Sequence, residues 1–119
     1  GMSVIIRESE IVYRNWGYYD VLGEIINDDM HTKVKMLVVD PGASLSLQYH
    51  KHRSEIWFVA EGKGKLDRGN GEIETIHIGM KYMIYEGQKH RLINPTDKKL
   101  VIIEIQYGDK CEEEDIVRL

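Results

Sequence analysis

Hydrophobic and polar residues alternate along this chain in short runs, and clusters of turn-forming residues separate the runs. The clearest separators are Asn27-Asp28-Asp29, Asp40-Pro41-Gly42 and Arg68-Gly69-Asn70-Gly71, because Gly, Asn, Asp and Pro suit tight turns. Alternation at this spacing is typical of half-buried strands. We predict strands over residues 4–7, 18–26, 32–39, 45–50, 55–60, 63–67, 72–78, 81–85, 89–93 and 100–107.

The chain contains no repeat, low-complexity stretch or Pro/Ser-rich linker, which predicts one domain over residues 1–119. Residues 108–119 are expected to be a C-terminal tail with a solvated glutamate run, and Gly1 is interpreted as a cloning remnant. Ile and Val number 24 against 2 Ala, a ratio that favours strands over helices. A sheet of many short strands avoids unpaired edges by closing into a barrel or a two-sheet sandwich, so we predict an all-β jelly-roll barrel.

Composition and charge argue against several functional classes. The net charge of -4 lacks the basic balance of nucleic-acid binders, and no apolar run is long enough to cross a membrane. Cys111 is the single cysteine, which excludes an internal disulfide and a cysteine-rich zinc finger. The first residues lack the features of a signal peptide, so we expect a cytoplasmic protein. Strand edges exposed on a small barrel further predict a homodimer.

The chemically richest segment covers residues 48–57. Side chains alternate along a strand, so Gln48 and His50 share one face, and Glu55 shares a face with Trp57 on the next strand. Two adjacent antiparallel strands could therefore aim Gln48, His50 and Glu55 at one point, and His90 is a candidate fourth group. One amide oxygen, two imidazoles and one carboxylate suit a divalent metal ion.

Spacing alone leaves ordinary interpretations open. A His-x-His pair also occurs on exposed strand ends, and His31 and His77 are interpreted as histidines of polar strand edges. Arg53 lies two residues before Glu55, so an extended backbone would place both side chains on one face. A solvated loop arginine would have the same spacing. Glu104 and Gln106 share a face of a very apolar strand, which favours pocket lining, although an exposed strand face explains them nearly as well.

Two spaced motifs resemble those of the cupin superfamily. The first is Gly42, five residues, Gln48, one residue, His50, four residues, Glu55, six residues, Gly62. The second is Gly79, five residues, Tyr85, one residue, Gly87, two residues, His90, three residues, Asn94. This resemblance implies a double-stranded β-helix whose metal is held by Gln48, His50, Glu55 and His90, with His52 in the loop.

A narrower resemblance covers residues 13–119. The run Gln48-Tyr49-His50-Lys51-His52-Arg53-Ser54-Glu55-Ile56-Trp57 resembles the Gln-x-His-x-His-Arg-x-Glu-x-Trp signature of the C-terminal cupin domain of type II mannose-6-phosphate isomerases, the phosphomannose isomerase/mannose-1-phosphate guanylyltransferase family. Further matches are Arg14-Asn15-Trp16-Gly17, Lys89-His90-Arg91-Leu92-Ile93-Asn94-Pro95, Ile103-Glu104-Ile105-Gln106 and Glu114-Asp115-Ile116-Val117-Arg118. Asn15 replaces the family's proline, and neither its nucleotidyltransferase domain nor its tail beyond Arg118 is expected here, so we expect a stand-alone domain.

The resemblance implies a metal-dependent isomerase that interconverts mannose 6-phosphate and fructose 6-phosphate, or a related sugar phosphate, in polysaccharide biosynthesis. Zinc is the first expectation for its one divalent ion, with manganese, iron and nickel as alternatives. Arg53 and Glu104 are the expected catalytic residues. The expected substrate-binding residues are Trp57, Gln106, Lys89, Arg91 and Arg118.

Two other functions stay open on the sequence. A metal-containing cupin could bind sugars or regulate without turnover, which the missing tail and partner domain favour. A cupin dioxygenase with iron is the second alternative, and Gln48 counts against it because those enzymes resemble a set of three histidines and one glutamate. Lys89 and Arg91 flank His90 and should point opposite to it, outside the barrel or at its rim.

Overall fold

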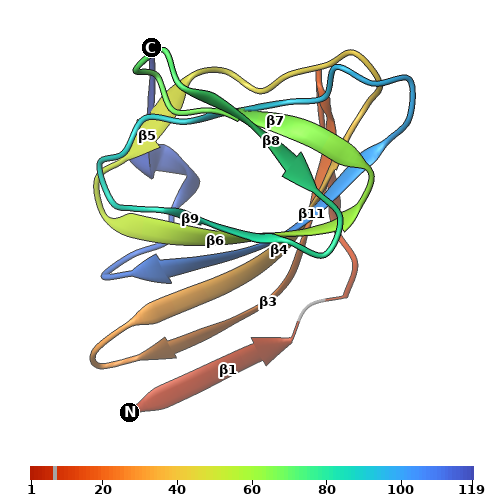
Figure 1. The fold of residues 1–119 in the computed structure, drawn as a ribbon. Coiled ribbons are helices and arrows are strands. Elements are labelled where there is room, and N and C mark those ends of the chain that lie inside the picture. The colour runs from red at the N-terminus through yellow and green to blue at the C-terminus, as the bar shows by residue number, and fades with distance from the viewer. Residues whose placement is uncertain (7) are drawn as a thin grey trace.

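The computed structural model describes residues 1–6 and 8–119, and strands form most of them (Figure 1). The all-β prediction is confirmed; Arg7, the last residue of the predicted edge strand 4–7, lies outside the described residues. No helix in the described part of the chain is long and apolar enough to cross a membrane. The elements are β1 (Met2–Ile6), β2 (Ile11–Arg14), β3 (Gly17–Asn27), β4 (His31–Val39), β5 (Gln48–His50), β6 (Arg53–Glu61), β7 (Lys63–Asp67), β8 (Ile73–His77), β9 (Lys81–Ile84), β10 (Arg91–Ile93), β11 (Leu100–Gly108), the short 3-10 helix η1 (Glu113–Asp115) and β12 (Ile116–Arg118).

The strands form two layers that enclose the interior of a barrel (Figure 1). The larger layer has the order β1-β3-β4-β11-β6-β9, and β2 pairs with β3 on the same side as β1. The opposite layer consists of the sheets β10-β7-β8 and β12-β5, which are linked by single bridges from Ser44 to Ile93 and from Gln48 to His90. All strand pairs are antiparallel, so the alternation of side chains decides which residues enter the barrel.

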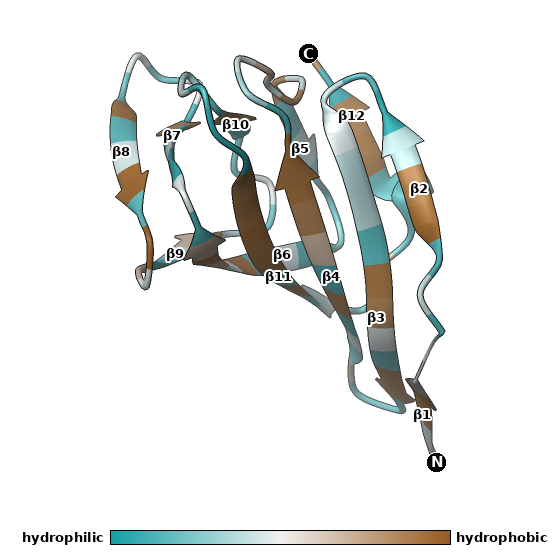
Figure 2. Ribbon diagram, turned by 90° about the vertical axis from the view of Figure 1, so that its right-hand side faces the viewer, coloured by the Kyte–Doolittle hydropathy of each residue, from teal (hydrophilic) through white to brown (hydrophobic). Residues whose placement is uncertain are grey.

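The inward positions of the central strands change character along their length. At one end of the barrel they are apolar and fully buried, as Val39, Val59 and Ile102 illustrate. At the other end the inward positions of the same strands carry Lys35 and Glu104, which are also buried. Figure 2 shows in brown the apolar end of β4 beside the apolar start of β11, which pair with each other. The interior is therefore divided into an apolar end and a polar end.

The turn before β3 needs a glycine. Gly17 has a φ of +142°, and a Cβ atom there would lie 2.0 Å from the carbonyl oxygen of Val38 on β4. This close approach lets the amide of Asp40 donate to the carbonyl of Trp16 at 2.9 Å. The turn over residues 14–17 is thereby held against the barrel, where Arg14 and Trp16 reach the interior cavity.

The C-terminal residues belong to the barrel. β12 pairs with β5, and its Arg118 lies opposite Gln48. The expectation of a solvated glutamate run holds for Glu112 and Glu114 but is wrong for Glu113, whose carboxylate forms an ion pair with the buried Lys35. The alternation of β4 places this lysine inside the barrel, where its charge needs a carboxylate partner.

Candidate metal centre

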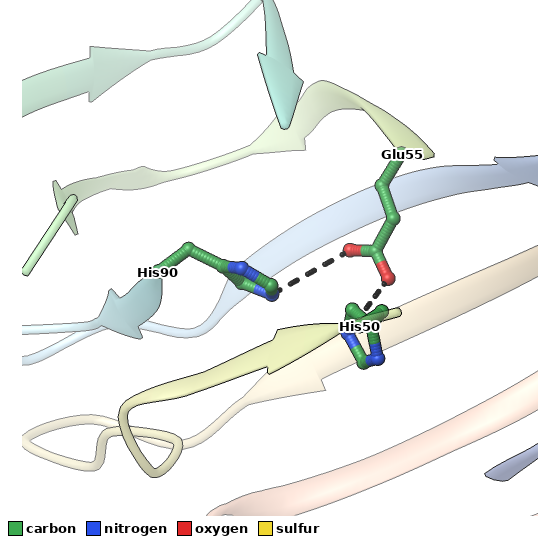
Figure 3. A group of neighbouring side chains, drawn as sticks. All are labelled: His50, Glu55 and His90. Carbon is green, nitrogen blue, oxygen red and sulfur yellow. Dashed lines mark ion pairs between the residues drawn. The ribbon is translucent and has the colours of Figure 1, made fainter. Parts of the chain in front are cut away.

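Three predicted ligands converge inside the polar end of the barrel. His50 ends β5, Glu55 follows on β6 after a short loop, and His90 precedes β10 on the opposite side of the interior. All three side chains are buried, and their ligand atoms lie within 4.8 Å of one another. The Glu55 carboxylate lies between the two imidazoles, 3.1 Å from Nε2 of His50 and 3.9 Å from Nε2 of His90 (Figure 3).

Backbone carbonyls orient both imidazole rings. Nδ1 of His50 lies 3.1 Å from the carbonyl oxygen of Asp115, and Nδ1 of His90 lies 3.0 Å from that of Gln88. A carbonyl only accepts, so each Nδ1 carries the proton and each Nε2 presents a lone pair. Nε2 of His90 is buried and has no hydrogen-bond partner among residues 1–6 and 8–119. Two lone pairs and a carboxylate that face one another are donors that fit a divalent metal ion.

The protonation states agree with this fit. Burial, the largest influence, lowers the pKa of His90 and favours its neutral form, although the Glu55 carboxylate opposes the shift. Burial would raise the pKa of Glu55, but the positive charge around it, that of Arg53 included, holds that pKa well below its usual range. A neutral imidazole and an ionised carboxylate are the forms that bind metals.

Arg53 lies beside the ligands, as its parity with Glu55 predicts. Its Nε donates to Oε2 of Glu55 at 3.1 Å, Nη2 to Nε2 of His50 at 3.2 Å, and Nη1 to the carbonyl oxygen of Glu112 at 3.2 Å. The alternative of a solvated loop arginine is wrong, because Arg53 is buried. A metal on His50 would need the lone pair that Nη2 now engages, so the guanidinium would have to leave that contact for His50 to act as a ligand.

Trp57 belongs both to the core and to the site. The indole N–H donates to Oε1 of Glu55 at 3.0 Å, and the ring packs edge-on against His90 with centroids 5.7 Å apart. Only 2% of Trp57 is exposed. The side chain predicted to contact substrate therefore also orients a metal ligand.

Gln48 lies on the same face of β5 as His50 and is half-buried. Its backbone exchanges hydrogen bonds with His90, at 3.0 Å and 2.9 Å, which ties together two strands that carry ligands. Its side chain, like that of His50, lines a cavity inside the barrel. Its role as a fourth ligand stays a prediction.

A cavity of about 580 Å³ opens above these residues. Glu104 and Gln106 line it from β11, and the Gln106 amide donates to the Glu104 carboxyl group. Burial, followed by the charge of Glu55, raises the pKa of Glu104 to about 8. Both residues are buried, so the interpretation of pocket lining holds and an exposed strand face is excluded.

The predicted cationic residues differ in their positions. Arg91 and Arg118 line the cavity, and Arg91 also donates to Asp67 at 2.8 Å. Arg91 therefore lies at the rim of the barrel, which is one of the two positions predicted for it; the other was outside the barrel. Lys89 is exposed and is absent from the lining of the cavity, so the structure does not bring it to the site. Arg14 lines the cavity although sequence reasoning did not select it; the Arg14-Asn15-Trp16-Gly17 match was the available signal.

Sequence reasoning also missed a network that holds the C-terminal segment on the site. Lys35 lies in the cavity lining, forms an ion pair with Glu113, and has its Nζ 4.4 Å from the centre of the Tyr19 ring. Cys111 is fixed by His31, whose Nδ1 accepts from its backbone N–H at 3.1 Å. The Asp115 carboxylate accepts from the backbone N–H groups of residues 51 and 52. His31 is thus half-buried and paired, which differs from the polar edge expected for it.

Comparison with known proteins identifies the family. The family model described as mannose-6-phosphate isomerase C-terminal matches residues 4–119. The chain belongs to this family. Xanthan biosynthesis protein XanB of Xanthomonas campestris pv. campestris is 42% identical over 107 residues, which are 90% of this chain and 22% of that protein. Mannose-1-phosphate guanylyltransferase ManC of Salmonella typhimurium is 38% identical over 107 residues, 90% of this chain and 21% of ManC.

The chain thus spans about a fifth of the length of these curated relatives. Solved structures identify the fold. Capsular polysaccharide assembling protein CapF of Staphylococcus aureus superposes with a TM-score of 0.72 at 18% identity, over 95% of this chain and 33% of CapF. A Klebsiella pneumoniae protein with a double-stranded β-helix domain gives 0.67 at 19% identity, over 96% of this chain and 90% of that protein. The predicted cupin fold is confirmed.

Proposed function

We propose that this domain is a metal-dependent isomerase of sugar phosphates, with mannose 6-phosphate and fructose 6-phosphate as its first candidate pair. The observation that carries the proposal is one cavity lined both by His50 and Glu55 of the candidate ligand cluster and by the buried carboxyl group of Glu104. Family membership and the relatives XanB and ManC support the choice of a mannose phosphate and a role in polysaccharide biosynthesis. The cavity of about 580 Å³ has the size of a small-molecule site.

His50, Glu55 and His90 would hold one divalent ion, with Gln48 as a fourth ligand. The mixture of nitrogen and oxygen donors suits zinc first, and also manganese, iron or nickel. When bound, the ion would polarise the oxygens on C1 and C2 of the sugar. Arg53, released from His50, would remain beside Glu55 and Glu104 and stabilise negative charge that develops on the substrate.

Glu104 is our candidate for the proton transfer. Aldose–ketose isomerisation moves one proton from C2 to C1 and a second from the oxygen on C2 to that on C1, and a single carboxyl group can carry the carbon-bound proton. Glu104 lines the cavity, and its strand β11 lies beside the strand of Glu55. The hydrogen bond from Gln106 fixes the orientation of its carboxyl group. Its pKa of about 8 lies near neutral pH, which suits both directions of transfer.

The rim of the cavity provides cations for the phosphate group. Arg14, Arg91 and Arg118 line the cavity from three different elements. Arginine binds phosphate through paired N–H donors, so residues at the opening could fix the phosphate while the sugar reaches the metal. Arg53 is a poorer candidate for this role, because its three N–H contacts are already made deep in the barrel.

A coupled assay tests the proposal. The purified domain is stripped of metal, reconstituted with zinc or manganese, and supplied with mannose 6-phosphate while formation of fructose 6-phosphate is followed. We expect turnover that requires the metal and is lost in His50→Ala. If calorimetry showed binding of mannose 6-phosphate but the assay showed no turnover, the domain would be assigned as a non-catalytic sugar-binding domain instead of an isomerase. Absence of both binding and turnover would reject a sugar-phosphate site.

A further inference from the structure

Lys35 brings an ammonium group into the interior cavity, and the hydrogen transfer assigned to Glu104 does not use it. Only 4% of Lys35 is exposed. Burial takes a charged group out of water at a large cost in free energy, which an apolar residue at this position would avoid. A buried lysine that lines a cavity of small-molecule size is therefore a candidate for a role in the chemistry of that cavity.

Lys35 lies directly beside the carboxyl group proposed as the base. It is paired with Glu104 in the register of β4 and β11, and both side chains line the cavity. Side chains that are opposite each other on antiparallel strands have Cβ atoms about 5 Å apart. Burial, the largest influence, raises the pKa of Glu104, and the positive charge of Lys35 opposes that rise. The two groups are thus close enough to act on one small molecule.

Two contacts fix the ammonium group in the cavity. Nζ of Lys35 forms an ion pair with the Glu113 carboxylate and lies 4.4 Å from the centre of the Tyr19 ring. Glu113 and Tyr19 line the same cavity. An ammonium group has three N–H donors, of which one is given to Glu113 and one faces the ring, so a donor is left for a ligand.

Isomerisation of a sugar phosphate needs two proton carriers. Glu104 is our candidate for the hydrogen that moves between C2 and C1, but the proton on the C2 oxygen must also reach the C1 oxygen. A carrier for this second proton has to donate and accept in turn. Arg53 cannot accept a proton, because a guanidinium stays protonated in proteins, whereas a lysine can alternate between ammonium and amine.

We propose that Lys35 carries the oxygen-bound proton of this isomerisation, a role that rests on the proposed function. As Glu104 takes the hydrogen from C2, the electron pair of that bond forms the C1=C2 double bond, and the Lys35 ammonium gives a proton to the C1 oxygen. The resulting amine then takes the proton of the C2 hydroxyl while C2=O forms, and Glu104 returns its proton to C1. Both residues end in the protonation states in which they began.

Lys35→Arg in the metal-loaded domain separates proton transfer from charge. Arginine keeps the positive charge and can pair with Glu113, but it does not release a proton. We expect kcat for mannose 6-phosphate to fall about a hundredfold, while melting temperature and metal content stay near the wild type. Lys33→Ala is the matched control: Lys33 follows the same face of β4 and donates to the carbonyl of Cys111 at 2.7 Å, but it is outside the cavity lining, so its kcat should hold.

Exchange of the C2 hydrogen with deuterium from the solvent is a readout that a purely structural role would not move. Lys35→Arg leaves Glu104 in place, so removal of the C2 hydrogen should persist while transfer between the oxygens fails. The ratio of exchange to isomerisation should therefore rise at least about tenfold. Lys35→Ala covers the case in which arginine does not fit: added propylamine should restore turnover, whereas tetramethylammonium, which has no proton to give, should not.

These measurements separate the role of Lys35 from the proposed function. A Lys35→Arg protein with the kcat of the wild type would overturn the role and leave the isomerase intact. Exchange and isomerisation that fall in parallel, or a Lys35→Ala protein that propylamine does not restore, would likewise overturn it. A wild type that turns over no sugar phosphate would instead overturn the proposed function, and this role with it.

Discussion

The two ends of the barrel interior are built on the same strands but by opposite chemistry. On β11, the inward residues Leu100 and Ile102 are fully buried in the core, and two positions later Glu104 is buried in the cavity wall. On β6, the change runs from Val59 to Glu55. The apolar end gains free energy from burial, whereas the polar end loses solvation that paired charges must offset. The comparison indicates that the fold is stabilised at one end so that the other can hold charges away from water.

The polar end depends on partners from the C-terminal segment. Lys35 is matched by Glu113, and Nδ1 of His50 donates to the carbonyl of Asp115. The apolar end lies within a single hydrophobic cluster and needs no such partners. We therefore expect substitutions at the apolar end to change stability and substitutions at the polar end to change chemistry.

Glu104→Gln should give the largest effect at the polar end. The amide keeps the shape and a hydrogen-bonding partner for Gln106 but cannot accept the substrate proton, so kcat should fall about 10²–10⁴-fold. Steady-state kinetics with mannose 6-phosphate measure this change, while metal content and melting temperature should stay near the wild type. Unchanged kcat would remove Glu104 from the proton transfer.

Ile102→Ala should show the opposite pattern from the same strand. Removal of a fully buried side chain at the apolar end should lower the free energy of unfolding by about 2–5 kcal/mol. Urea titration measures this loss. The metal content of the folded variant should be that of the wild type, and a parallel loss of metal would show that the two ends are not separable.

Arg118→Ala should have a smaller effect, confined to phosphorylated ligands. The guanidinium lines the cavity, so its removal should weaken mannose 6-phosphate binding about tenfold and leave mannose unaffected. Calorimetry measures both affinities. Lys89→Ala is the matched control, because Lys89 is exposed and outside the cavity lining; equal losses in both variants would deny Arg118 a specific role.

The polar end was only partly predictable from sequence. Side-chain parity showed that Gln48, His50 and Glu55 could converge, and the resemblance to the cupin motifs implied that they do so as ligands together with His90. Lys35 was missed because a lysine that alternates with Val34 and Met36 normally faces water. Glu113 was missed because nothing local in an acidic run reveals that a lysine 78 positions away needs a partner.

The burial of charged side chains inside the barrel also explains why the fold was easier to predict than the location of the charges. Ten of the strand regions could be read from alternation and turn residues, since these signals do not depend on which face is buried. β2 was not predicted because it is short and runs directly into the turn before β3. β12 was not predicted because it is short and its partner β5 lies far earlier in the chain. Which face enters the barrel is a property of the closed structure.

Glu113→Gln should have the smallest effect, and one that depends on pH. Burial would raise the pKa of Glu113, but Lys35 lowers it overall, so the ionised carboxylate stabilises the fold above the ordinary pKa of 4.5. This contribution is lost as the pH falls through the lowered folded pKa. We expect the variant to lose up to about 1 kcal/mol at neutral pH, because Glu113 is 40% exposed. Thermal unfolding should show the difference vanish in acid; a difference that grows in acid would contradict the assignment.

The metal content of three proteins tests the central claim, that the polar end holds one divalent ion through His50, Glu55 and His90. Wild type, His50→Ala and His52→Ala are reconstituted with zinc, desalted and measured by elemental analysis. His52 is the matched control, because its side chain is 38% exposed in the loop and belongs to no ligand cluster in the described residues. We predict close to one ion per chain in the wild type and in His52→Ala, and loss of the ion in His50→Ala. A His50→Ala protein that retains the ion, or a wild type that binds none, would contradict the account.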